Sequence, residues 1–142
     1  MKKIDWIIHL VSNGVKCSEC DETENGFLPN MCDAHTHGMD KYGHQEFQIV
    51  LMIGAELICY ILNALGLRVQ AGESFKDGDS VGEIIKDYDV RIKEVEVDGK
   101  KLLRVILPDA QGCFPEDVHC AEYYNQQHYP MEMLYSNHNI IN

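Results

Sequence analysis

The chain has 142 residues, with 23 Asp and Glu against 12 Lys and Arg, and its formal net charge is −11. A field of this sign repels phosphate backbones and anionic lipid headgroups, which argues against nucleic-acid binding and against a membrane-surface role. One domain is the natural count for this length. Such a chain buries roughly 68–70% of its unfolded surface, so we expect a true hydrophobic core.

The first residues lack the pattern of a targeting segment. Asp5 and His9 interrupt the apolar run after the basic start, and no small-residue cleavage site follows. No apolar stretch approaches the roughly 20 residues that cross a bilayer. We therefore expect a cytoplasmic protein, in which the six cysteines are thiols or metal ligands rather than disulfides.

The first half of the chain predicts a helix, a polar loop, a strand and a second helix. An opening helix is expected because four apolar residues share one helical face: Trp6, Ile7, Leu10 and Val11. Asn13-Gly14 would end it, and residues 15–33 are polar and aperiodic. The apolar run over residues 47–53 predicts a buried strand. The helix that opens at Gly54-Ala55-Glu56 is expected to end at Gly66.

The second half predicts a hairpin and a short terminal helix. Residues 70–82 form a glycine-rich, acidic loop, and residues 90–97 form a strand whose alternation slips between Lys93 and Glu94, which suggests a bulge. Asp98-Gly99 turns the chain back into a second strand. Pro115 begins a last helix toward Tyr124.

These elements predict an α+β fold, with residues 1–142 in a single domain. We expect a mainly antiparallel sheet, a central helix and a Cys/His-rich segment over residues 15–44. The exposed edge of the hairpin could pair two chains into a homo-oligomer.

The Cys/His-rich segment concentrates the side chains that bind transition metals. Cys17 and Cys20 form a C-x-x-C pair, and Cys32 and His35 form a second pair, with eleven residues between the two pairs. Thiolate and imidazole are the ligands that Zn²⁺ prefers, and this spacing is typical of a structural zinc site. The loop between the pairs is too polar to fold by burial, so a bound ion would order it. The sequence predicts that these four residues bind zinc.

The zinc prediction leaves three alternatives open. His37 could replace His35 as the fourth ligand, since three histidines compete for that position. The acidic residues around Cys17 and Cys20 fit a solvated loop with free thiols equally well. A C-x-x-C pair can also cycle between dithiol and disulfide, although acidic flanks disfavour the reactive thiolate.

A histidine-based metal site is a second interpretation. His35, His37 and His44, with Asp40 or Glu46, could bind an ion and leave one position open for water. Alternation along a strand puts His35 and His37 on one face. The ion would lower the pKa of the water toward about 7, and Glu46 could take its proton, as in a metal-dependent hydrolase. The simpler interpretation is that His44 and Glu46 hydrogen-bond a turn beside the strand.

Two local patterns resemble known proteins. The letters of residues 33–37, D-A-H-T-H, resemble the D-x-H-x-H motif that opens many metal-dependent amidohydrolases. Those enzymes use a TIM-type barrel of 200 or more residues, and no apolar strand leads into the motif here, so we interpret the match as local coincidence.

The middle of the chain resembles a bacterial family known as domain of unknown function 4262, over about residues 34–117. The resemblance depends on four ordered segments: Thr36-His37-Gly38-Met39, Tyr42-Gly43-His44-Gln45-Glu46-Phe47, Ile61-Leu62-Asn63, and Pro108-Asp109 with Gly112-x-Phe114-Pro115. This chain departs from the family pattern at His37, where Val is usual, and at Gln45, where Pro is usual. The resemblance implies a bacterial or phage origin and a cytosolic α+β domain, and it implies no activity.

The function predicted from the sequence is a zinc-stabilised binding or regulatory module, with a protein or small molecule as its partner. A metal-dependent hydrolase with a His-rich site is the alternative. Cys113, His119 and Cys120 form a further group of metal ligands, or a nucleophile with a base, around the short C-terminal helix. Three such residues more often pack than react, and no nucleophile-elbow motif accompanies them.

Overall fold

A six-stranded mixed sheet with one long helix forms the protein in a computed structural model, which describes residues 3–12, 27–109, 111–115 and 122–134. The strands are β1 (Ile7–Ser12), β2 (Met31–His37), β3 (Phe47–Leu51), β4 (Ser80–Val81), β5 (Val90–Val97) and β6 (Lys100–Ile106). The helices are α1 (Ala55–Gln70) and α2 (Glu122–Asn125), with 3-10 turns η1 (Met39–Tyr42), η2 (Gln126–His128) and η3 (Met131–Met133). The predicted α+β class is confirmed.

The strand order across the sheet is β1-β2-β3-β6-β5-β4. All neighbours pair antiparallel except β3 and β6, which run parallel through Phe47 opposite Leu103 and Gln48 opposite Arg104. The sheet is therefore mainly antiparallel, as predicted, with one parallel pair that makes it mixed. Since β1 and β4 are the outer strands, β6 of the hairpin pairs with β3, and the two-residue β4 pairs with Val90 and Arg91 of β5. The pairing of two chains along the hairpin stays a prediction.

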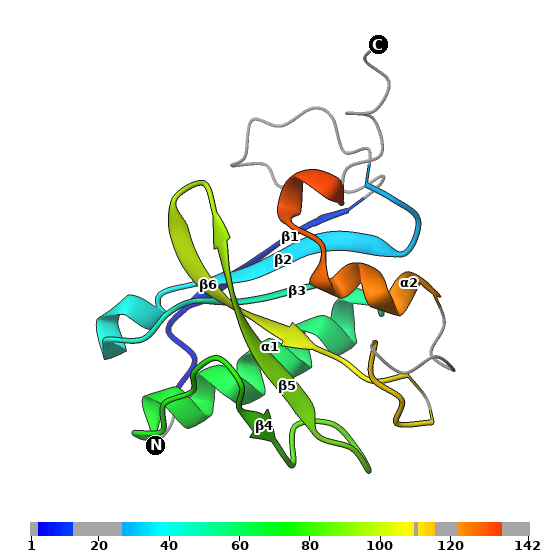
Figure 1. Cartoon of the computed structure of the whole chain (residues 1–142). Coiled ribbons are helices and arrows are strands. Elements are labelled where there is room, and N and C mark those ends of the chain that lie inside the picture. The colour runs from blue at the N-terminus through cyan, green and yellow to red at the C-terminus, as the bar shows by residue number, and fades with distance from the viewer. Residues whose placement is uncertain (1–2, 13–26, 110, 116–121, 135–142) are drawn as a thin grey trace.

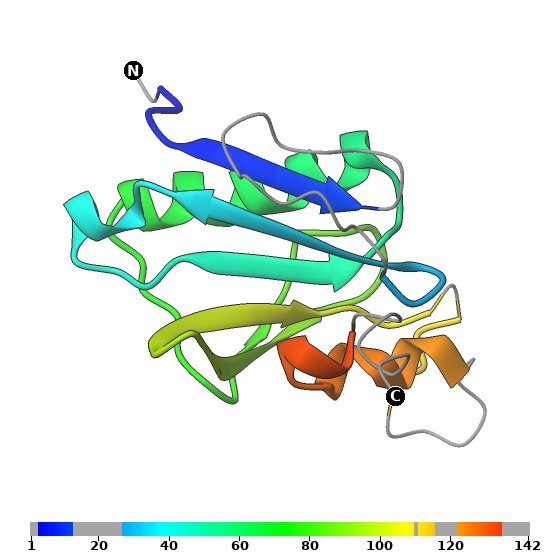
Figure 2. The same ribbon diagram turned by 90° about the horizontal axis from the view of Figure 1, so that it is seen from above.

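The two faces of the sheet have different covers. Helix α1 lies along one face, while α2, η2 and η3 lie over the other (Figure 1), and the view from above shows the same layers (Figure 2). The helix packs through buried residues at helical spacing: Ile58, Ile61, Leu62, Leu65 and Val69. They form the core together with apolar residues of the strands. Every residue of β3, for example, is buried.

The opening helix predicted from Trp6 to Val11 is wrong, because this segment is strand β1. It pairs antiparallel with β2, from Ile7 opposite His37 to Ser12 opposite Cys32. Alternation directs Ile8 and Leu10 toward the core and leaves Ile7 56% exposed. An edge position beside β2 thus overrides the weak helical pattern.

The helix α1 continues past Gly66, where we expected it to end. Gly66 is buried in the helix, and a Cβ on it would lie 2.6 Å from the indole of Trp6. This glycine therefore serves close packing, not termination. The Trp6 indole also donates a hydrogen bond of 2.9 Å from Nε1 to Asn63 Oδ1, which fixes the start of β1 against α1.

The β5–β6 hairpin is confirmed. Asp98 and Gly99 both have positive φ, 53° and 82°, as a two-residue type I′ turn requires. The bulge expected between Lys93 and Glu94 is wrong, because the β5–β6 register is continuous from Arg91 to Val97. The sheet is instead irregular in β2, where the register against β3 shifts between Met31 and Ala34.

The predicted helix from Pro115 toward Tyr124 lies partly outside the described residues, and its described part is the single turn of α2. Across the described ranges, no helix has both the length and the apolar character that a membrane span requires.

Candidate metal site

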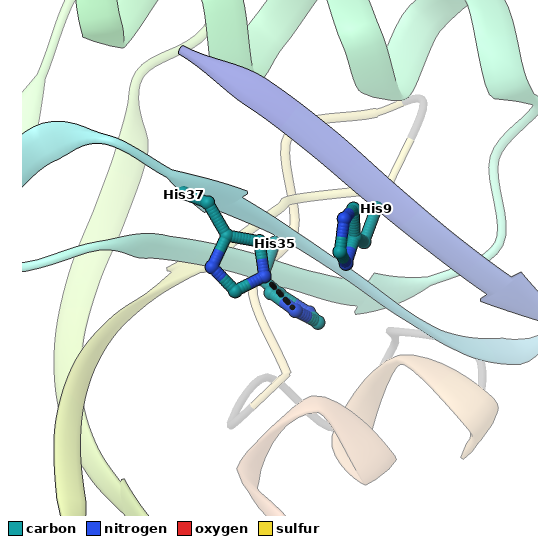
Figure 3. A group of neighbouring side chains, drawn as sticks. All are labelled: His9, His35 and His37. Atoms are coloured by element: carbon teal, nitrogen blue, oxygen red, sulfur yellow. Dashed lines mark hydrogen bonds between the residues drawn. The ribbon is translucent and has the colours of Figure 1, made fainter. Parts of the chain in front are cut away.

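Strand β2 presents two kinds of side chain on its two faces. Asp33, His35 and His37 are partly buried or exposed and lie on one face, because alternate residues of a strand point the same way. His9 of β1 pairs directly with His35, which places it on that face as well. The sheet pairing therefore brings together three histidines from two strands, as Figure 3 shows.

The three imidazoles are close enough to share one ion. His35 Nε2 lies 3.1 Å from His37 Nε2, and the His9 ring centre lies 4.3 Å from that of His37. One ligand nitrogen from each ring lies within 4.8 Å of the others. A zinc tetrahedron with Zn–N bonds of about 2.0–2.1 Å has edges of about 3.3 Å, so small side-chain rotations would complete three of its corners.

Asp33 orients the central histidine. His35 Nδ1 lies 3.1 Å from Asp33 Oδ1, and a carboxylate partner requires that this nitrogen carry the proton. The tautomer then leaves the Nε2 lone pair of His35 directed at His37, whose Nε2 lies 3.1 Å away. A carboxylate behind a metal-binding histidine is the usual arrangement in such sites, because it fixes the ring and strengthens the ligand.

A series of hydrogen bonds connects Asp33 through the buried side chain of Gln48 to Arg104. Gln48 Nε2 donates to Asp33 Oδ1 over 3.1 Å, and Arg104 Nε donates to Gln48 Oε1 over 2.8 Å. Gln48 and Arg104 are 1% and 0% exposed. Burying a guanidinium costs several kcal/mol unless its donors are satisfied. Further Arg104 bonds to the backbone carbonyls of Gln127 (2.9 Å) and Tyr129 (2.6 Å) meet that condition and tie the η2 segment to the sheet.

The pKa directions follow from this chain. Burial opposes ionisation of Asp33, but hydrogen bonds from His35 and Gln48 and the positive charges of His35 and Arg104 outweigh it, so the Asp33 pKa is lowered. Burial likewise opposes a charged His35, yet the Asp33 hydrogen bond and charge raise its pKa. Burial and the nearby charges of His35 and His9 lower the pKa of His37. Burial lowers the pKa of Arg104 to about 10 against the opposing charge of Asp33.

The histidines adjoin a cleft of about 580 Å³. His35 and His37 line it, together with residues of the β5–β6 hairpin such as Lys100 and Leu102. This volume is in the range of small-molecule sites. An ion on the histidines would therefore have room for a fourth ligand from the cleft.

The structure does not bring together the predicted Cys32–His35 pair. Cys32 is fully buried on the other face of β2, where its Sγ lies 3.8 Å from the Ile49 carbonyl oxygen. Burial and the adjacent charge of Asp33 raise its thiol pKa to about 12, which disfavours the thiolate that zinc needs. Cys17 and Cys20 lie outside the described residues, as do His119 and Cys120.

Glu46 and His44, the two residues considered for catalysis, make structural hydrogen bonds to nearby backbone groups. Glu46 accepts hydrogen bonds from the backbone nitrogens of Gly38 and Met39 and from the Thr36 hydroxyl. His44 Nδ1 lies 2.8 Å from the Gln45 carbonyl oxygen, and its Nε2 accepts from the Phe75 backbone nitrogen over 2.9 Å. Both side chains thus make the structural contacts that the simpler interpretation described.

His9 and Asp33 belong to the candidate site, although the sequence pattern does not single them out. His9 was assigned to a helix, although the β-branched run around it and the alternation of Trp6, Ile8 and Leu10 would have indicated a strand. Asp33 stands out in the sequence only as the first letter of the D-x-H-x-H pattern. The same period of two that joins His35 and His37 also includes Asp33.

No protein-family description, curated protein or solved structure matches this chain. The resemblance to domain of unknown function 4262 therefore stays a prediction, and the arrangement of side chains is the basis for any functional assignment.

Proposed function

We propose that this protein is a zinc-binding module in which His9, His35 and His37 hold the ion and the cleft supplies its fourth ligand. The observation that carries the proposal is the convergence of three imidazoles with Asp33 behind His35. Imidazole nitrogens suit zinc, and the second hydrogen bond of a ligating histidine is the feature that prepares it for a metal. We place the module in the bacterial cytoplasm, as the sequence suggests.

A ligand-binding role is preferred over catalysis because of Glu46 and His44. Both were candidates to move protons, and both hold backbone N–H groups through hydrogen bonds. An open coordination position would then receive a small molecule or a side chain of a partner protein.

A metal-dependent hydrolase is the second candidate, and the all-histidine ligand set favours it. Three histidines plus one exchangeable position are the composition of catalytic zinc sites, in which bound water loses a proton near pH 7. Zinc-dependent cleavage of an activated ester such as 4-nitrophenyl acetate, absent from the apoprotein and from His37→Ala, would support it.

Zinc content per chain tests the proposal. We expect about one zinc per chain in the untagged protein and in the double variant Cys17→Ser/Cys20→Ser, and loss of zinc in His35→Ala and His37→Ala. His128→Ala is the matched control, because His128 contacts Lys93 away from the cleft. A cobalt-substituted sample should lack thiolate-to-cobalt charge-transfer bands. Zinc that disappears with the two cysteines and survives loss of the histidines would instead assign the ion to the cysteine set.

A further inference from the structure

A second, larger groove lies between α1, the loop of residues 83–88 and the end of β6. Its volume is about 730 Å³. The first turns of α1, the chain after β6 and α2 all lie at one end of the molecule in both views (Figures 1 and 2). The groove shares no lining residue with the histidine cleft, so any ligand it takes is independent of the zinc proposal.

The groove has an apolar floor and aromatic walls. Ile61, Ile84 and Leu107 line it and are at most 3% exposed, so they form a fixed base. The walls include three tyrosines: Tyr60, Tyr88 and Tyr124. Tyr60 is 61% exposed and Tyr88 38%, and the neighbouring Leu57 is 45% exposed. Large side chains gathered around one hollow distinguish a binding site from scattered surface apolar residues.

The Pro108-Asp109-x-x-Gly112 motif builds one side of this groove. Asp109 Oδ1 accepts from the backbone nitrogens of Gln111 and Cys113, each over 2.9 Å, and the Asp109 carbonyl accepts from Gly112. Gly112 has a φ of +83°, and a Cβ on it would lie 2.5 Å from the Tyr88 ring. The motif therefore makes a tight turn whose bare glycine lets the Tyr88 ring pack against it, which holds that aromatic wall in place.

Charge selects the ligand class. The lining contains three carboxylates, from Glu83, Asp87 and Asp109, against one ammonium from Lys86. The whole chain carries a net charge of −11, and this charge also repels anions. Tyrosine faces attract cations through the ring quadrupole, and the attraction strengthens where water is excluded.

We propose that this groove binds a small organic amine, with its apolar or aromatic body against Ile61, Ile84 and Leu107 and its cationic nitrogen among the tyrosine rings. The amine enters as the ammonium ion and no bond is made or broken. The ligand thus belongs to the class of alkylamines and arylalkylamines, whose nitrogen is protonated at neutral pH.

Three probes that share a phenylalkyl body and differ in charge test the preference for a cation. We would titrate the protein with 4-phenylbutylamine, 4-phenylbutan-1-ol and 4-phenylbutanoate by calorimetry and by backbone amide NMR. We expect the amine to bind at least about tenfold more tightly than the carboxylate, with the alcohol between them. Amide shifts should concentrate in residues 57–61, 83–88 and 107–109. Titrations in His37→Ala would show the same order, which separates this groove from ligation at a metal.

Variants of Tyr60 and Gly112 test whether the amine binds in this groove. Tyr60→Ala should weaken amine binding roughly tenfold, whereas Tyr60→Phe keeps the ring and should stay within about twofold. Tyr60 is exposed, so both variants should fold, and Met133→Ala is the control at an exposed apolar residue elsewhere. Gly112→Ala should weaken binding by displacing Tyr88. Equal affinity for the three probes would overturn the amine assignment, and unchanged affinity in Tyr60→Ala, or no saturable binding, would overturn the site.

Discussion

The two faces of β2 are built from neighbouring residues and have opposite chemistry. Cys32, Ala34 and Thr36 are fully buried on the face toward α1. Asp33 and His35 alternate with them on the other face, where they join a hydrogen-bonded chain that leads to Arg104. One face stabilises the protein by burying apolar surface, and the other is organised around polar groups that point to a common centre.

Alternate side chains of β2 therefore have different roles: those that face α1 stabilise the fold, and those on the other face form the candidate site. Residues at odd positions can change the metal site while residues at even positions hold the sheet on α1. The expected consequences of substitution differ between the faces in size and in kind.

The largest expected effect is on the helix-facing side, at Phe47. Its ring is fully buried and contacts those of His44 and Phe75, so Phe47→Ala removes a large core side chain. We expect a loss of about 3–5 kcal/mol in the free energy of unfolding, measured by urea denaturation. The exposed Ile7→Ala on β1 should cost less than about 0.5 kcal/mol. The folded Phe47→Ala variant should still bind zinc. Loss of zinc in this variant would contradict the idea that residues facing α1 do not affect the metal site.

The next largest effect is expected at Arg104, on the polar face. Arg104→Met keeps much of the volume but leaves the Gln127 and Tyr129 carbonyls without their donor. Each buried acceptor left unpaired costs about 1–3 kcal/mol, so we expect a loss of about 3 kcal/mol on urea unfolding. Arg68→Met is the matched control, because the Arg68 side chain is 34% exposed, and its ion pair with the exposed Glu73 and its bond to the Gly82 carbonyl should together contribute less than about 1 kcal/mol. Equal costs for the two variants would contradict a stabilising role for the buried chain.

Asp33→Asn should act on the metal and less on the fold. The substitution keeps the shape but removes the charge that holds the His35 proton on Nδ1. We expect zinc affinity to fall about 10- to 100-fold in a competition titration with a chelator. Asp40→Asn, in the same cleft, should change the affinity less than about threefold. If both variants bind zinc as tightly as the unmodified protein, Asp33 does not support a metal ligand.

The smallest effect is expected at Cys32. Cys32→Ala should cost about 1 kcal/mol and leave zinc content unchanged, because the thiol lies on the helix-facing side. Because its pKa is raised to about 12, the Cys32 thiol stays almost entirely protonated at pH 8 and becomes substantially ionised only as the pH approaches 12. Iodoacetamide at pH 8 should leave Cys32 unmodified in the native protein and alkylate it in urea, as mass spectrometry of peptides would show. Rapid native alkylation would mean that the residue is accessible.

Long apolar patterns predicted the fold well. The run from residue 47, the helical spacing of α1 and the Asp98-Gly99 turn all correspond to observed elements. Each depends on local preferences or on a strong periodicity, which a sequence carries directly. The pattern does not predict β1, because an edge strand gains its stability from pairing with β2, whose partner residues lie 20 to 30 positions away, from Ser12–Cys32 to Ile7–His37.

The candidate site was only half predicted. His35 and His37 share a face by simple alternation, and the sequence places them there. His9 joins them through sheet pairing, and Arg104 through the parallel neighbour of β3. Spacing along the chain favoured Cys32 as a partner of His35, but spacing does not say which face of a strand a side chain occupies once its register and cover are set.

The amino-acid sequence by itself determined the acidic charge, the α+β class, the hairpin turn and the pairing of His35 with His37 on one strand face. Only the tertiary structure decided that Cys32 enters the core while His9, Asp33, Gln48 and Arg104 assemble on the opposite face. The physical reason is that composition and period are local properties. Strand order, register and the choice of buried face follow from packing the whole sheet against α1 and the C-terminal turns.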